Sequence, residues 1–413
     1  MIFEVLRGIV GITVILAIAY LFSSHKDRIN YRTILLALLL QISFGALVLF
    51  VPAGKDLLLS ISNGVAGVIS FSDEGINFLF GDIGRKNLGF LFAFHVLPIV
   101  VFFSSLIAVF YYLGIMSRVI NFIGGGLQKL LATSKTESLS AAANIFVGIT
   151  EAPLVIKPYL PTLTTSQLFA VMVGGMATVA GSVLAGYASL GVELKYLIAA
   201  SFMAAPAGLL MAKLIIPETE SEEKIESLVA TANENNIDTP ENIIDAAATG
   251  AIQGLKLALN IGAVLLAFVS LVAMLNALTA WIGSLFGADA LSLQQILGTL
   301  FQPIAYIMGV PWSEANLAGS LIGEKIVINE FVAFIDFIAH AKELSPKSQI
   351  IVIFALCGFA NFGSIAVVIG GMGALAPTRR KELSRLGLKA VLAGALANLL
   401  SACIAGIFFT LGQ

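Results

Sequence analysis

The sequence predicts an all-α integral membrane protein with eight transmembrane helices, two re-entrant hairpins and interfacial helices arranged as an inverted repeat. Of its 413 residues, 58% are hydrophobic and only 12% are charged. That is about half the charged share of an ordinary soluble domain, so the chain cannot cover its surface with charge. The 39 glycines agree with this, because small residues let membrane helices pack closely. Long apolar runs recur along the whole chain.

Eight of these runs are long enough to cross about 30 Å of hydrocarbon. They are residues 3–23, 33–51, 91–114, 167–191, 194–216, 253–282, 348–374 and 386–411. No small-residue cleavage site follows the first run, so we expect a retained helix and not a removed signal peptide. Residues 56–69 are apolar but interrupted by Ser, Asn and Gly, which is typical of an amphipathic helix at the membrane interface. Residues 124–129 close a second segment of this kind.

Charged loops predict the orientation in a plasma membrane. Basic residues cluster at 26–32, between the first two spans, and at 379–385, between the last two. Short loops rich in Lys and Arg stay on the cytoplasmic side, so eight spans place both termini outside. The acidic residues gathered between 218 and 245 indicate a solvated loop.

Two further apolar regions, 136–160 and 309–335, are too interrupted to be helices exposed to lipid. Each contains a proline and a glutamate, and each is long enough for two half-helices that enter and leave on the same side. Irregular backbone at membrane depth survives only where protein covers it or where it lines a wet cavity. We therefore expect both regions to form re-entrant hairpins.

Each hairpin is followed by a span with a polar interruption. The first interruption is ATVAGSV at 177–183 and the second is FANFGSI at 359–365. The regions 91–216 and 253–411 thus share one order of span, hairpin, broken span and span. An odd number of crossings between two such units would insert them with opposite topology, which is the inverted-repeat design of secondary transporters.

The hairpin carboxylates Glu151 and Glu330 are the first candidate site residues. A carboxylate at a helix centre costs about 2.5–3.5 kcal/mol on insertion scales, so each must face a polar partner or water. One reading is a glutamate bonded to backbone amides that stabilises a hairpin tip. The other is a carboxylate that accepts hydrogen bonds from a polar solute, which is favoured because the two glutamates recur at matching places.

Three more polar groups adjoin the interruptions. Asn144 and Thr178 offer side-chain oxygens beside unpaired backbone carbonyls, a combination that suits a hard cation such as Na⁺. For either residue taken alone, helix capping or an interhelical hydrogen bond is a better explanation than a ligand role. Phe359 and Asn361 place an aromatic face beside an amide at the second interruption.

Other classes of protein are disfavoured. A net charge of -2 gives no field suited to nucleic acid. Cys357 and Cys403 lie inside apolar runs and behave as small hydrophobes. No Ser-Lys, paired-Asp or zinc-site spacing marks an intramembrane enzyme. An ion channel with the hairpins as pore loops, and a transporter driven by protonation of Glu151 or Glu330, remain as alternatives.

At these residues the chain resembles the concentrative nucleoside transporters, most closely their bacterial sodium-coupled branch, from end to end. The resemblance rests on AANIFVGITEAP at 142–153, TVAGSV at 178–183, NEFV at 329–332 and CGFANFGS at 357–364, with PETE at 217–220 also fitting. It implies a homotrimer in the lipid bilayer. In each protomer a scaffold holds a mobile domain that carries both hairpins and moves in an elevator-like manner to take up a nucleoside.

The resemblance also implies residue roles. Gly148, Ile149, Thr150 and Glu151 would form the hairpin tip, with Thr150 and Glu151 on the nucleobase and Phe359 and Val183 packed against it. Glu330, Asn361 and Ser364 would hold the ribose hydroxyls. Na⁺, the coupling ion, would bind the side chains of Asn144 and Thr178 and the carbonyls of Val147 and Val179. Many bacterial members have Ser at the position of Thr178, which keeps the hydroxyl group. The proton-coupled branch lacks the asparagine found here as Asn144, so the resemblance favours Na⁺ as the coupling ion.

The expected division of the chain follows from this likeness. It comprises two N-terminal spans (1–52), a scaffold segment with an interfacial helix and the third span (53–135), a first transport half (136–216), an acidic loop (217–245), a second scaffold segment (246–308) and a second transport half (309–413).

One position departs from the family pattern, and it yields a prediction. The family's first hairpin usually reads Gly-Gln-Thr-Glu, whereas this chain has Ile149 in place of Gln. A glutamine can exchange hydrogen bonds with a base edge, and an unmade buried hydrogen bond costs about 1–3 kcal/mol. We expect Ile149→Gln to reorder purine against pyrimidine nucleosides in competition uptake by proteoliposomes. An unchanged ranking would show that this position does not contact the base.

Overall fold

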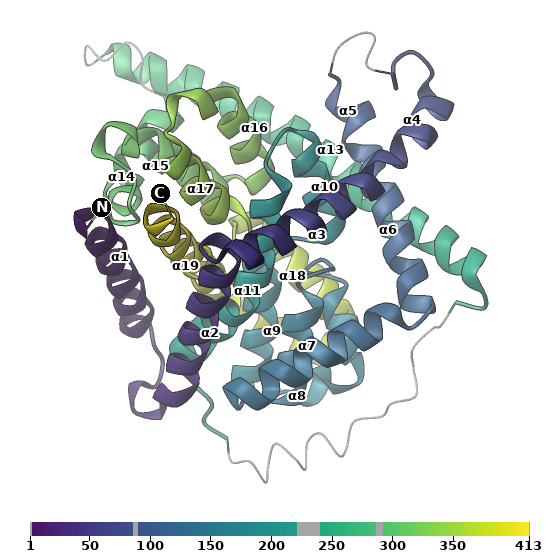
Figure 1. Cartoon of the computed structure of the whole chain (residues 1–413), viewed down its shortest axis with the longest axis horizontal. Coiled ribbons are helices and arrows are strands. Elements are labelled where there is room, and N and C mark those ends of the chain that lie inside the picture. The colour runs from purple at the N-terminus through teal and green to yellow at the C-terminus, as the bar shows by residue number, and fades with distance from the viewer. Residues whose placement is uncertain (1, 86–89, 221–239, 286–291, 413) are drawn as a thin grey trace.

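The computed structural model describes residues 2–85, 90–220, 240–285 and 292–412, and within these ranges every regular element is a helix (Figure 1). The α-helices are α1 Ile2–Leu21, α2 Tyr31–Leu49, α3 Pro52–Ser70, α4 Ser72–Phe80, α5 Phe92–His95, α6 Leu97–Tyr112, α7 Ile115–Leu131, α8 Lys135–Ala143, α9 Thr165–Ala177, α10 Gly181–Ser189, α11 Leu194–Ile215, α13 Ile243–Ser284, α14 Leu293–Ile307, α15 Trp312–Val327, α16 Glu330–His340, α17 Pro346–Leu356, α18 Phe362–Leu375 and α19 Arg380–Leu411. Short 3-10 turns are η1 Lys26–Arg28, η2 Ala152–Thr162, η3 Ala341–Glu343 and η4 Pro377–Arg379. The all-helical class predicted from the sequence is confirmed for these residues.

Among the described residues, seven helical segments are long and apolar enough to cross a membrane. The predicted span at 348–374 is not one of them, because it is divided into α17 and α18, each too short to cross alone. The segment 357–361 separates the two helices, and Asn361 caps the start of α18. The span predicted at 167–191 is likewise broken, between α9 and α10.

The helix predicted at 253–282 begins earlier than expected. α13 starts at Ile243 and runs for 42 residues, which at 1.5 Å per residue is about 63 Å. Asn242 caps its start by accepting hydrogen bonds from the backbone N–H groups of Ile244 and Asp245. The first turns of α13, which consist mostly of Ile and Ala, thus continue the helix beyond the predicted span. Most of the predicted acidic loop at 217–245 lies outside the described residues.

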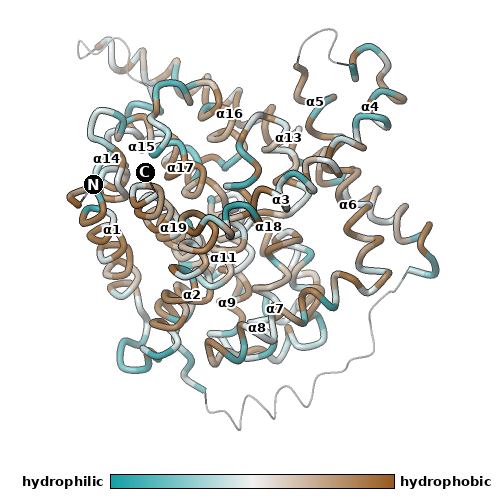
Figure 2. The backbone as a smooth tube through the Cα atoms, viewed as in Figure 1, coloured by the Kyte–Doolittle hydropathy of each residue, from teal (hydrophilic) through white to brown (hydrophobic). Residues whose placement is uncertain are grey.

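The apolar helices fall into an inner and an outer group. In the most apolar stretch of the α9–α10 segment, 94% of the residues are buried, and the share is 89% in α11 and 83% in the η4–α19 segment. In α13 the share is only 11%. Hydrophobic residues nevertheless continue along the outer helices, as Figure 2 shows for α1 and α6. Apolar residues that the protein does not cover require an apolar surrounding. The outer helices therefore present the surface for lipid or for other copies of the chain.

Close packing joins α13 to α6. A Cβ atom at Gly250 would lie 2.5 Å from Ala108 Cβ, and one at Gly254 would lie 2.7 Å from Ser104 Cβ and 2.8 Å from Val101 Cα. Two glycines four residues apart share one helix face. This face lets the two helices approach without intervening side chains, as small residues do between membrane helices.

Both predicted basic loops lie on one side of the molecule. His25, after α1, and Arg385, near the start of α19, line one surface depression together with Thr165 and Pro217. The Ser24 backbone N–H also donates to the carbonyl of Ile215 at the end of α11. Figure 1 marks N and C close together, and both lie away from the side that carries the basic loops. This arrangement agrees with the orientation predicted from charge.

We expect Gly254→Ala to destabilise the protein by about 1–3 kcal/mol, the usual cost of overpacking a tight contact, because α13 would have to separate from α6. Thermal unfolding in detergent measures this effect. Gly125→Ala is the matched control, since a Cβ at Gly125 on α7 would meet nothing within 4 Å and alanine is the better helix former. Equal melting temperatures for the two variants would contradict the proposed packing.

Candidate functional site

The two broken helices meet at their interruptions. α9 ends at Ala177 and α10 begins at Gly181, while α17 ends at Leu356 and α18 begins at Phe362. The backbone N–H of Phe359 donates to the carbonyl oxygen of Thr178 at 3.2 Å. The two polar interruptions, far apart in the sequence, thus satisfy each other's backbone groups. The predicted site residues lie in separate groups, of which the first surrounds Glu330, the second includes Glu151, and the third consists of the predicted cation ligands.

Glu330 organises the first group. Its carboxylate accepts hydrogen bonds from the Tyr187 hydroxyl and from Asn361 Nδ2, each at 3.0 Å. Asn361 in turn accepts from the backbone N–H and the hydroxyl of Ser364 at 2.9 and 3.1 Å. Val183 precedes Tyr187 by four residues, so both occupy one face of α10. The structure therefore brings Glu330, Asn361 and Ser364 together, and Val183 lies on the helix face that carries Tyr187.

The local sequence explains where Glu330 stands. Asn329 caps α16 by accepting a hydrogen bond from the backbone N–H of Val332 at 2.9 Å. Glu330 is the first residue of that helix, where the positive end of the helix dipole favours a carboxylate. Asn361 caps α18 in the same way through Ser364. Two helix starts thus converge on one buried polar cluster.

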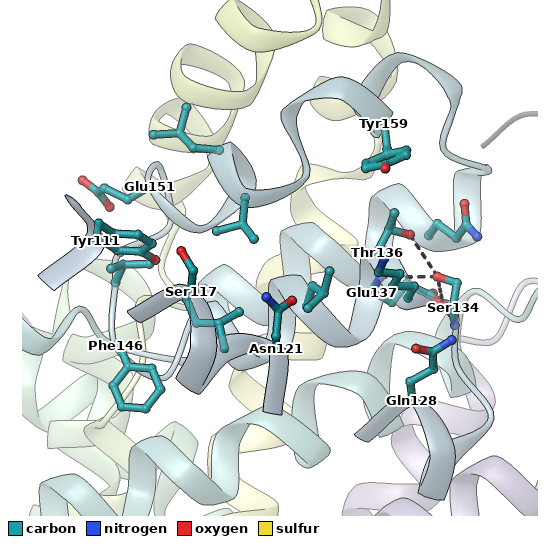
Figure 3. A pocket seen from close by; sticks show the side chains of 18 of the residues that line it. Tyr111, Ser117, Asn121, Gln128, Ser134, Thr136, Glu137, Phe146, Glu151 and Tyr159 are labelled. Atoms are coloured by element: carbon teal, nitrogen blue, oxygen red, sulfur yellow. Dashed lines mark hydrogen bonds between the residues drawn. The ribbon is translucent and has the colours of Figure 1, made fainter. Parts of the chain in front are cut away.

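Glu151 belongs to the second group, which faces a cavity of about 1640 Å³. The cavity is also lined by Val147, Gly148 and Tyr111. Figure 3 shows Glu151 and Tyr111 at one end of it and the Ser134–Glu137 turn that caps α8 at the other. A Cβ at Gly148 would meet the Glu151 carboxylate, so the two residues lie in direct contact. This volume exceeds that of a typical ligand pocket, so the cavity is a vestibule.

Ile149 and Thr150 point elsewhere in this conformation. A Cβ at Gly175 of α9 would lie 2.6 Å from Ile149 Cγ1, and one at Gly371 of α18 would lie 2.6 Å from Thr150 Cγ2. Both side chains therefore pack against helices and do not line the cavity. They anchor the hairpin tip to the two broken helices.

Two of the predicted cation ligands, Asn144 and Thr178, both lie against Gly174 of α9. Asn144 Nδ2 donates to the Ser140 carbonyl at 2.9 Å, while its Oδ1 is buried and has no hydrogen-bond partner. Thr178 donates its hydroxyl proton to the Gly174 carbonyl at 2.8 Å, which leaves oxygen lone pairs free. Among the described residues no backbone N–H donates to the carbonyl of Val147 or Val179. A buried oxygen without a donor is costly unless a cation binds it, so this set suits a hard monovalent ion.

Sequence reasoning missed two side chains. Tyr187 lies in an apolar stretch and gave no signal of its own, although its spacing from Val183 could have revealed it. Tyr111, in α6, has a buried hydroxyl without a hydrogen-bond partner beside the Glu151 end of the cavity. An isolated tyrosine in an apolar helix is usually interpreted as an anchor at the membrane interface. Only the fold shows that Tyr187 contacts Glu330 and that Tyr111 lines the cavity.

Paired broken helices, a buried glutamate hydrogen-bonded to both of them and an outer layer of exposed apolar helices define the class of protein as a multi-pass membrane transporter. Residues 10–83 and 196–406 match the N- and C-terminal parts of the family described as "Na+ dependent nucleoside transporter", and residues 93–193 match a segment described as "Nucleoside recognition". The chain belongs to this family of Na⁺-dependent nucleoside transporters.

Individual relatives agree over nearly the whole chain. The chain is 50% identical to "Nucleoside permease NupC" of Helicobacter pylori, over 100% of this chain and 99% of that one. It is 38% identical to "Sodium/nucleoside cotransporter 1" of Mus musculus, over 98% of this chain and 64% of that one. Its structure is similar to that of CNTnw in an inward-facing substrate-bound state, with a TM-score of 0.94, 54% identity and 99% of each chain covered.

Tyr187→Phe tests the Glu330 cluster. Loss of one of two donors to a buried carboxylate is expected to destabilise the protein by about 1–3 kcal/mol and to weaken substrate binding several-fold. Thermal unfolding and uptake measure the two effects. Tyr31→Phe is the control, because Tyr31 at the start of α2 is 64% exposed. A Tyr187→Phe variant with unchanged stability and uptake would show that this hydroxyl does not support Glu330.

Proposed function

We propose that this chain is a secondary active symporter that couples inward Na⁺ movement to nucleoside uptake. The observation that carries the proposal is the backbone contact between Phe359 and Thr178. It joins the set of oxygens suited to a cation to the set of polar groups suited to a sugar. Ion and solute sites that share one pair of broken helices can respond to each other.

The Glu330 cluster supports recognition of a ribose. Glu330 is an acceptor, Asn361 offers both a donor and an acceptor, and Ser364 offers a hydroxyl, which matches adjacent hydroxyl groups that each donate and accept. Phe359 is only partly buried, so its ring is available to a base together with Val183. Thr150 and Glu151, at the first hairpin tip, are proposed to read the base edge when the tip rearranges around the substrate.

Na⁺ is the second substrate. The side-chain oxygens of Asn144 and Thr178 and the carbonyls of Val147 and Val179 are proposed as its ligands. Asn144 Oδ1 is the strongest support, because it is buried and lacks a donor. These neutral oxygens bind a cation without a carboxylate, so the ion adds a net positive charge to the transported complex.

One ion supplies enough driving force. One inward charge gains about 2.3 kcal/mol per 100 mV, and a tenfold Na⁺ gradient adds about 1.4 kcal/mol. The sum, about 3.7 kcal/mol, supports roughly 500-fold accumulation of a neutral solute. A second coupling ion is not required.

The architecture supports an elevator-like movement. We propose eight crossings, with α17 and α18 forming one of them, and re-entrant hairpins at 136–160 and 309–335 in two halves of opposite topology. The transport halves, 136–216 and 309–413, contain the buried inner helices. The scaffold segments, 53–135 and 246–308, contain α6 and α13, whose exposed apolar surface supports assembly of a homotrimer.

The vestibule supports an inward-open state. Its lining includes Arg28 and Glu218, which lie on the side of the basic loops. That side is cytoplasmic by the charge rule. The cavity therefore connects the Glu151 hairpin tip to the cytoplasm in this conformation.

Uptake of labelled uridine and adenosine into proteoliposomes, with Na⁺ replaced by choline at fixed pH, tests the proposal. We expect uptake to fall to the level of empty liposomes without Na⁺. We also expect Na⁺ to raise the melting temperature of the wild type but not of Asn144→Leu, since a ligand stabilises the state that binds it. Uptake that persists in choline and follows a proton gradient would replace the mechanism with H⁺ coupling.

A further inference from the structure

Lys325 is a buried cation that the proposed mechanism does not use. It stands in the last turn of α15 and is 1% exposed. Its ammonium donates to Asn398 Oδ1 on α19 at 2.8 Å. A buried charge is costly and persists only with strong partners. Lys325 is stabilised by the hydrogen bond to Asn398 and by charge attraction to the Glu330 carboxylate of the next helix.

Asn398 holds both broken helices. Its Nδ2 donates to the carbonyl of Ala177, the last residue of α9, at 2.7 Å. It also donates to the carbonyl of Cys357, directly after α17, at 3.0 Å. Carbonyls at a helix end lack intrahelical partners and carry the partial negative charge of the helix dipole. The Asn398 amide thus links the Lys325 ammonium, through its oxygen, to the carbonyls at the ends of α9 and α17, through its nitrogen.

The surroundings leave no room for another arrangement. A Cβ at Gly358 would collide with the Asn398 amide and lie 2.8 Å from the Ala177 carbonyl oxygen. A Cβ at Gly394, one turn before Asn398, would lie 3.0 Å from Met176 Cβ and 3.1 Å from Ala360 Cβ. α19 is therefore fitted against both interruptions at once.

The position of this pair relates it to both proposed ligand sites. Ala177 is adjacent to the proposed Na⁺ ligand Thr178, and Cys357 lies two residues before Phe359. Lys325 lies five residues before Glu330 on the same hairpin. The pair therefore ties the backbone beside the ion site to the backbone and the hairpin beside the sugar site.

We propose that Lys325 and Asn398 are positioning residues that couple Na⁺ binding to nucleoside binding. This inference rests on the proposed Na⁺-nucleoside symport. Ordering of the first interruption by Na⁺ orders the second because Asn398 holds the two helix ends as one body, and Lys325 fixes Asn398. Without Lys325 and Asn398, the two interruptions become ordered independently, and the affinity for one ligand no longer depends on whether the other is bound.

The coupling is measured as the ratio of nucleoside dissociation constants without and with saturating Na⁺, a quantity that is reciprocal between the two ligands. Calorimetry on the purified full-length protein gives it, with uridine or adenosine, whichever the wild type binds more tightly. We expect a ratio on the order of 10 or more in the wild type and within about twofold of 1 in Lys325→Met and Asn398→Asp. Asn398→Asp keeps an acceptor for Lys325 but loses the amide that donates to the two carbonyls.

Ser401→Ala is the matched control. Ser401 is also buried on α19, but it accepts a hydrogen bond from Gln41 of α2 at 2.8 Å and touches neither interruption by any hydrogen bond in the described structure. We expect its ratio to equal that of the wild type. A general loss of stability would raise both dissociation constants and leave their ratio unchanged, so the readout separates coupling from packing.

The outcomes are distinct. A wild-type ratio of 1 would refute Na⁺ coupling and with it the proposed function. A large wild-type ratio that Asn398→Asp retains would overturn the present inference alone, and this variant decides the matter if Lys325→Met does not fold. A ratio that falls equally in Ser401→Ala would also overturn it, because the effect would then belong to α19 packing in general.

Discussion

Unpaired backbone groups at membrane depth are the constraint on which the rest of this structure depends. The breaks between α9 and α10 and between α17 and α18 free N–H and C=O groups that would each cost several kcal/mol in hydrocarbon. They are tolerated because Phe359 donates to Thr178 and because Asn398 donates to the carbonyls of Ala177 and Cys357. This mutual pairing forces the broken helices into the centre, where α11 and α19 enclose them. The apolar helices α1, α2, α6 and α13 are left for the lipid-facing surface.

The chemistry of the site follows from the same breaks. A continuous membrane helix leaves backbone groups unpaired only at its two ends, whereas a broken one presents helix starts and free carbonyl oxygens at the depth of the break. Glu330 and Asn361 stand at such helix starts, and their side chains are hydrogen-bonded to each other. Asn144 supplies an oxygen that no donor satisfies. The proposed cation ligands are neutral oxygens, and the Glu330 cluster offers both hydrogen-bond donors and acceptors, which suits one small cation and a neutral solute.

Much of the fold could be predicted from the sequence because membrane insertion is governed by local composition. Hydropathy located the apolar segments, and the interruptions at 177–183 and 359–365 coincide with the observed helix breaks. Helix ends set by capping were less accessible, as the early start of α13 at Ile243 shows. Of the candidate site residues, Glu330, Asn361 and Ser364 meet as one cluster. Ile149 and Thr150 pack instead on glycines of α9 and α18, which no spacing in the sequence indicates.

By itself, the sequence determined that this protein spans a membrane, which segments are apolar and where they are interrupted. These properties reside in short windows of the chain and follow from the cost of charge and of free backbone groups in hydrocarbon. Only the tertiary structure decided that Tyr187 supports Glu330 and that Asn398 reaches a carbonyl 221 positions away. Such contacts depend on which helices become neighbours. That choice is made by the fit of whole helix faces, not by any local pattern.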